Sequence, residues 1–182
     1  MTHEQVAGSS EPVAFAVPGR PGRVVVSKGM LETLDSAERR VVYAHEHSHL
    51  RRHHHRFLHV ADAAAAAVPL LEPLNRQVRF ATERWADEDA VVEVGDRRLV
   101  ARAVARAALA SSASGVHPTP LGINGSGARA RVEALMLPPG GVTAATLAWG
   151  SLGMVGLAVS VAGTTVQFHH LVAFVFHICG LH

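Results

Sequence analysis

Two short apolar runs rich in valine, residues 13–17 and 23–26, begin the hydrophobic pattern of the chain. Residues 18–22 between them (Pro-Gly-Arg-Pro-Gly) have strong turn chemistry, so we expect a β-hairpin that braces the domain. The alternative is that an exposed edge strand of this hairpin pairs with an extended peptide. The polar residues 1–12 predict a disordered tail, and they lack the basic start and apolar core of a signal peptide.

Helical patterns follow the hairpin. Residues 30–34 predict a short helix, and Asp35 followed three residues later by Glu38 predicts a capping box at the start of a longer one. We expect this helix to continue into the basic run at residues 51–56, which is typical of a solvated helix end or a membrane-surface contact. Residues 57–71 are apolar and rich in alanine, and a buried or interface-lying helix is expected there.

Further helices are expected at about residues 75–93 and 99–108. The second has leucine, valine and alanine at helical spacing on one side and arginines on the other. A segment rich in Ser, Gly and Pro at residues 111–127 predicts a flexible linker or lid, and residues 128–137 predict a short helix. Because 48% of the residues are hydrophobic but only 5% are aromatic, a mainly α fold is favoured.

The composition changes after Glu133, which is the last charged residue of the chain. Residues 142–163 are uncharged, mostly apolar and long enough to span a bilayer, which needs about 20 such residues. A buried helix in a soluble core is the alternative. Residues 168–181 form a second apolar run that is short for a full span, and a partial span or an interfacial helix is expected there.

The basic residues and the cysteine content restrict the topology and the chemistry. Every Lys and Arg lies at or before Arg131, on the N-terminal side of the expected span. The positive-inside rule therefore predicts that the N-terminal domain faces the cytoplasm at a bacterial inner membrane. Cys179 is the only cysteine, which excludes an intrachain disulfide and a thiolate zinc site.

The segment with the clearest chemistry is residues 45–49, which read HExxH. On a helix, His45 and His49 lie on one face and can offer two imidazoles to one Zn²⁺ ion. Glu46 then lies close enough to take a proton from a water on that metal. Because the chain contains 13 histidines, a basic and solvated helix face is the alternative.

The expected helix at residues 75–93 offers a third ligand. Glu83 and Asp87 fall on one side of it, together with apolar residues. We expect Glu83 to complete the metal site and Asp87 to accept a hydrogen bond from the second nitrogen of a ligand histidine, fixing its tautomer. The alternative is that both are surface acids paired with Arg79 or Arg84.

His55 is a competing third ligand, because it stands at the spacing of the last histidine in HExxHxxGxxH. That pattern needs a glycine for a sharp turn, and this chain has Arg52 at the corresponding position. Without the turn the helix continues and carries His55 away from His49. We therefore expect Glu83 rather than His55 to bind the metal.

Four stretches considered together, residues 18–26, 34–39, 44–50 and 83–88, resemble the BlaR/MecR-type family of membrane zinc metallopeptidases, in particular its short actinobacterial members. The resemblance covers about residues 13–163, and HtpX-type membrane proteases are similar more distantly. It implies a mainly helical, zincin-like domain of the gluzincin type, facing the cytoplasm and followed by a membrane helix. In the family pattern the metal ligands match His45, His49 and Glu83, the catalytic glutamate matches Glu46, and the following aspartate matches Asp87.

The chain differs from that family pattern in two respects. Family members usually carry several membrane helices before the zinc domain, and those of the antirepressor branch carry an extracellular penicillin-binding sensor; this sequence contains neither. Antibiotic sensing is therefore not expected. A minimal protease, working with a partner membrane protein or as a homo-oligomer, is expected instead.

These observations predict four segments: a disordered tail at 1–12, a zinc metallopeptidase domain at 13–112, a linker with a short helix at 113–141, and a membrane anchor at 142–182 with one span at 142–163. The predicted function is a membrane-anchored zinc endopeptidase that hydrolyses a protein or peptide substrate in the cytoplasm. A catalytically silent membrane module that binds metal or signals by conformation is the alternative. No nucleic-acid partner is expected.

Overall fold

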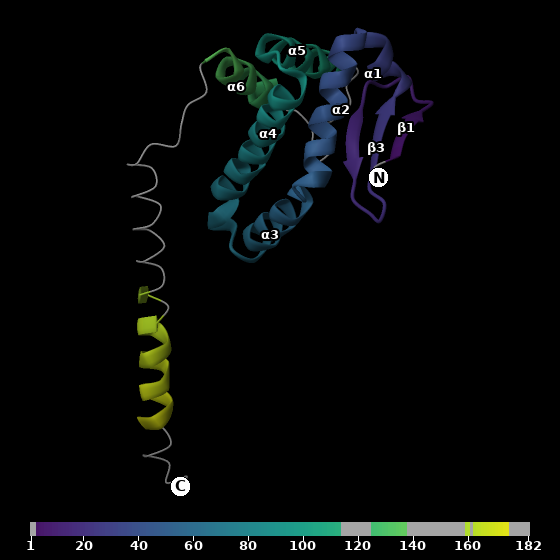
Figure 1. Cartoon of the computed structure of the whole chain (residues 1–182). Helices are drawn as coiled ribbons and strands as arrows, with labels where there is room; N and C mark the ends of the chain where they lie inside the picture. Colours follow the sequence, from purple (N-terminus) through teal and green to yellow (C-terminus); the bar gives the residue numbers. More distant parts are fainter. Residues whose placement is uncertain (1–2, 114–124, 138–158, 161, 175–182) are drawn as a thin grey trace. The chain divides into compact units, whose positions relative to one another are not determined.

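The computed structural model describes residues 3–113, 125–137, 159–160 and 162–174 (Figure 1). Contacts within the chain divide it into two units, Met1–Pro139 and Gly140–His182. The described part of the first unit contains a small sheet and a set of helices. This confirms the prediction of a mainly α fold with a β-hairpin near the N-terminus.

The sheet has three strands, β1 (His3–Ala7), β2 (Ala14–Val17) and β3 (Arg23–Ser27), in the order β1-β3-β2. β2 and β3 are antiparallel and form the predicted hairpin, whereas β1 pairs with β3 in parallel. The prediction of a disordered tail is therefore wrong for residues 3–7. Val6 is largely exposed, so backbone pairing with the open edge of β3 rather than burial forms this strand, and a hydrophobic pattern does not reveal it.

The helices of the first unit follow the sheet in chain order: α1 (Lys28–Thr33), α2 (Ser36–Arg51), α3 (His54–Ala67), the 3₁₀ turn η1 (Pro69–Leu71), α4 (Glu72–Val94), α5 (Arg97–Ala113) and α6 (Gly125–Met136). α2 lies between the sheet and α4, and it packs against both (Figure 1). α5 packs against α2 and α6. The central position of α2 places the HExxH segment between the sheet and α4.

The start of α2 is fixed by the predicted capping box. The Asp35 carboxylate accepts hydrogen bonds from the backbone N–H groups of Ala37 and Glu38, and the Glu38 carboxylate accepts one from the N–H of Asp35. The side chain of Glu38 is fully buried, and it also accepts hydrogen bonds from Arg102 (2.9 Å) and Arg106 (2.8 Å) of α5. The cap therefore joins α2 to α5.

Two apolar clusters hold α2 in place. The larger one contains residues of α2, α4, α5 and α6, including Val41, Ala90, Val100 and Leu135. The smaller one joins the sheet to α1 and α5, and includes Val24, Val26, Met30, Leu34 and Ala107. Because both clusters are built from fully or nearly fully buried side chains, the helices that carry the HExxH segment and its expected third ligand are fixed relative to each other.

The prediction of one continuous helix through residues 51–56 is wrong. α2 ends at Arg51, His53 adopts the left-handed conformation with φ 55°, and α3 begins at His54. Histidine is among the residues that tolerate this conformation better than most, although no glycine or proline marks the turn in the sequence. The turn between the two helices lets α3 pack against α4.

The predicted membrane span at 142–163 lies largely outside the described residues, as does most of the linker at 111–127. In the second unit, residues 162–174 are helical. Across the ranges that the structure describes, no helix combines the length and the apolar character needed to cross a bilayer.

Candidate metal centre

The structure brings the three expected ligands together. His45 and His49 lie one turn apart on α2 and are almost completely buried, and Glu83 reaches them from the middle of α4. The two Nε2 atoms are 3.1 Å apart. His45 Nε2 lies 3.4 Å from Oε2 of Glu83, and His49 Nε2 lies 3.4 Å from its Oε1.

These separations fit a zinc ion. Ligand atoms at about 2.0–2.1 Å from a tetrahedral Zn²⁺ lie about 3.3–3.4 Å from one another, and two imidazoles with one carboxylate are a common ligand set for it. One ligand atom from each of the three residues lies within 4.8 Å of the other two. His55, the competing ligand, does not belong to this group in the described part of the chain.

Asp87 lies where the sequence placed it, one turn after Glu83. Its side chain is fully buried, and its Oδ1 is 3.1 Å from Nδ1 of His45. A carboxylate there accepts the Nδ1–H and leaves the lone pair of Nε2 free to face the centre. The alternative of surface acids is wrong, because the Glu83 side chain is only 13% exposed and Arg79 and Arg84 pair with Asp62 and Glu88 instead.

Arg131 is a residue of the site that the sequence did not indicate. It lies on α6, is 2% exposed, and donates two hydrogen bonds to Asp87 and one of 2.8 Å to Glu83. A segment rich in Ser, Gly and Pro separates it from α5, so no fixed spacing connects it to the HExxH segment. An arginine among the apolar positions of a short helix was the one available signal.

Carboxyl groups outnumber arginines at the site. Glu46, Glu83 and Asp87 supply three carboxyl groups, and Arg131 is the arginine that contacts two of them. Burial opposes the charged form of His45, but Asp87 and Glu83 raise its pKa above the ordinary value, whereas burial and the charge of His45 lower the pKa of His49. Without a metal, His45 therefore carries an extra proton and His49 does not, and a cation between the rings would replace that proton.

Glu46 is buried beside the ligands and close to the sheet. Burial raises its pKa to about 7, although the charge of His45 opposes the shift. A hydrogen bond with the backbone of Ala16 in β2 also stabilises its charged form. The edge strand β2 is thereby positioned next to the glutamate expected to act as base.

His54 is the second residue that the sequence did not indicate. The turn at His53 leaves the ring of His54 against α2, where its Nδ1 lies 2.9 Å from Nδ1 of His49. His54 is fully buried, and its ring centroid lies 5.4 Å from that of Trp85 on α4. Nothing in the basic run distinguishes His54 from its neighbours, because no glycine or proline marks the turn at His53.

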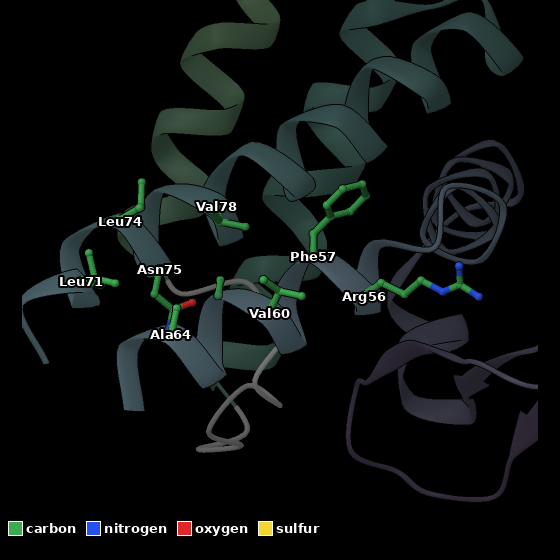
Figure 2. Close-up of a pocket in the computed structure, with 9 residues that line it drawn as sticks. Arg56, Phe57, Val60, Ala64, Leu71, Leu74, Asn75 and Val78 are labelled. Atoms are coloured by element: carbon green, nitrogen blue, oxygen red, sulfur yellow. The ribbon is translucent and has the colours of Figure 1, made fainter. Parts of the chain in front are cut away.

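A pocket of about 440 Å³ opens between α3, η1 and α4 (Figure 2). Its walls are mainly apolar and include Phe57 and Val60 from α3 and Leu74 and Val78 from α4, whose side chains Figure 2 shows around the space between the two helices. The ring of Phe57 lies 6.5 Å from that of Trp85. The pocket therefore begins beside the aromatic residue that packs on His54.

Comparison with known proteins gives one match. The sequence model described as peptidase family M48 matches residues 2–112. A search of curated proteins and a search of solved structures each gave no match. The matched range contains His45, His49 and Glu83 but ends before α6, so the contact from Arg131 comes from outside it.

Proposed function

Because the chain belongs to peptidase family M48, a family of zinc metallopeptidases, we propose that it is an endopeptidase that cuts internal peptide bonds of a protein substrate. The observation that carries this proposal is the convergence of two buried imidazoles and one carboxylate from two helices, with separations that match a zinc ligand set. His45, His49 and Glu83 would hold the ion.

Zinc, when bound, would act as a Lewis acid that polarises the scissile carbonyl and lowers the pKa of a water to about 7. Glu46 follows the first ligand in sequence, and its carboxylate is the base that takes a proton from the attacking water and passes it to the leaving amine. Asp87 holds His45 in the tautomer that ligation requires, and Arg131 holds the carboxylates of Asp87 and Glu83 in place.

The edge strand β2 gives a substrate peptide a place to bind. β2 pairs with β3 on one side, and Ala16 within it hydrogen-bonds Glu46. An extended peptide that adds to β2 would lie beside the base, which supports the β-augmentation alternative for the hairpin over a purely structural brace.

We also propose that residues 142–163 anchor the enzyme in a bacterial inner membrane with the centre on the cytoplasmic side. The support is the uncharged, apolar sequence after Glu133 and the confinement of all Lys and Arg to the N-terminal side of it. A closer relation to the BlaR/MecR-type proteins within this class of peptidases is part of the same proposal. Fractionation of cells expressing the full chain tests it, and recovery in the soluble fraction would oppose it.

The experiment for the enzymatic proposal uses the purified full chain and a library of fluorogenic peptides. We expect cleavage that a chelator abolishes and added Zn²⁺ restores. Glu46→Gln should retain one zinc per chain and lose cleavage, because glutamine cannot take the proton. Equal cleavage by wild type and Glu46→Gln would contradict the role of Glu46. A cellular phenotype that survives Glu46→Gln would favour the silent signalling module.

A further inference from the structure

The Nδ1 atoms of the two histidines expected to bind the metal have different partners. Nδ1 of His45 faces the carboxylate of Asp87, which can only accept a hydrogen bond when ionised. Nδ1 of His49 faces Nδ1 of His54, which is a second imidazole rather than a carboxylate. No carboxylate therefore fixes the tautomer of His49 at this nitrogen.

The protonation pattern of the pair follows from the ligand role of His49. A neutral imidazole carries one N–H, and a histidine that binds metal through Nε2 must carry it on Nδ1. The 2.9 Å contact then requires Nδ1 of His54 to be the bare acceptor, which places the proton of His54 on its own Nε2. Each ring is neutral, and each is held in one tautomer.

The burial of His54 Nε2 costs folding free energy. The residue is fully buried, and within the described residues that nitrogen is buried without a hydrogen-bond partner. An unsatisfied buried donor typically costs about 1–3 kcal/mol. An apolar side chain between His49 and Trp85 would avoid that cost, so the histidine is better explained by what its other nitrogen does.

We propose that His54 is a positioning residue that accepts the Nδ1–H of His49 and thereby holds the second metal ligand in its binding tautomer and orientation. The left-handed conformation of His53 places His54 against α2, the helix that carries His49. Packing against Trp85 on α4 fixes the acceptor ring, so the second ligand is tied to the same helix that supplies Glu83. This inference rests on the metal site of the proposed function.

The test measures zinc affinity of the full chain by competition with a chromogenic chelator. His54→Ala removes the acceptor and should weaken zinc binding about 10–100-fold, the usual effect of losing such a partner. His54→Asn offers an amide oxygen near the position of Nδ1 and should recover most of the affinity. His59→Ala is the matched control, since His59 is an exposed histidine of the same helix, and should bind zinc like the wild type.

A second measurement does not depend on the alanine variant folding. In ¹⁵N-histidine spectra of the zinc-loaded wild type, the signals of His54, identified by their absence in His54→Asn, should show a protonated Nε2 and a bare Nδ1. Zinc affinity unchanged in His54→Ala, equal loss in His54→Ala and His54→Asn, or a proton on Nδ1 of His54 would overturn the inference. Wild type that binds no zinc would overturn the metal site as well.

Discussion

Buried carboxylates lie at two places along α2, Glu38 at its first turn and a group beside its C-terminal half, and their charges are balanced differently. At the first turn, Glu38 is fully buried, and burial opposes its charged form. The backbone N–H of Asp35 and two arginines of α5 nevertheless hold its pKa below the ordinary value. At the other group, Glu83 and Asp87 share one arginine, Arg131, and burial raises the pKa of the nearby Glu46 to about 7.

The difference shows that burial alone does not decide what an acid on α2 does. Glu38 and Glu46 are both buried residues of one helix, but the first has its charge matched by neighbouring cations and the second does not. A balanced group is a structural join between helices. A group in which three carboxyl groups and two imidazoles share one arginine is a site for a cation, which can replace the extra proton on His45.

The largest effect should come from removing Arg131, the arginine that Glu83 and Asp87 share. Arg131→Met keeps the volume but leaves Glu83 and Asp87 without their partner, so we expect a loss of about 3–5 kcal/mol in the unfolding free energy of the metal-free protein. Zinc should restore part of it by binding the folded state. Urea denaturation with and without zinc measures both.

Arg129→Met is the matched control, because Arg129 lies on the same helix but is exposed and pairs with Glu133. It should change stability little, as exposed ion pairs do. A loss in Arg131→Met no larger than in Arg129→Met would mean that Arg131 does not hold the acids of the centre.

A smaller effect is expected at the balanced group. Glu38→Gln keeps a capping side chain at this position but loses the charge that the two arginines meet, so stability should fall by about 2 kcal/mol. Zinc content should remain that of the wild type, because the first turn of α2 lies away from the ligands. A loss of zinc in Glu38→Gln would show that the two groups are not independent.

The pH dependence of stability should also distinguish the wild type from Glu38→Gln. The pKa of Glu38 is lower in the folded chain than in the unfolded chain, so its contribution is complete above the unfolded value of about 4.3 and is lost as the pH falls through the folded value. The difference in urea midpoint between wild type and Glu38→Gln should therefore shrink between about pH 5 and pH 3. A constant difference across this range would contradict the ionic role of Glu38.

The smallest effect concerns the cap itself. Asp35 is exposed, and its carboxylate accepts the N–H groups of Ala37 and Glu38. Asp35→Asn preserves an oxygen acceptor and should leave the thermal midpoint nearly unchanged, whereas Asp35→Ala should lower it. Equal midpoints for the two variants would argue against the cap.

The sequence predicted the parts of the centre that follow from local spacing. His45 and His49 are one turn apart, Glu83 and Asp87 are one turn apart, and each pair occupies one face of its helix. The capping box and the hairpin were predicted on the same basis, since a few neighbouring residues specify them.

The sequence could not predict contacts that depend on an unmarked turn or on a separate segment. His54 meets His49 because His53 adopts a left-handed conformation without a glycine to signal it. Arg131 reaches Asp87 from α6, which begins after the expected linker. β1 forms because its backbone pairs with β3, although side chains such as Val6 are exposed. Periodicity reports which face of an element is buried and carries no information on these tertiary choices.

The most direct test of the account is the zinc content of the purified full chain, measured by elemental analysis for the wild type, Glu83→Ala and His55→Ala. Glu83 completes the ligand set, whereas His55 stands outside it in the described structure. We predict one zinc per chain in the wild type and in His55→Ala, and loss of zinc in Glu83→Ala. Zinc retained in Glu83→Ala, or lost in His55→Ala, would contradict the assignment of the metal centre.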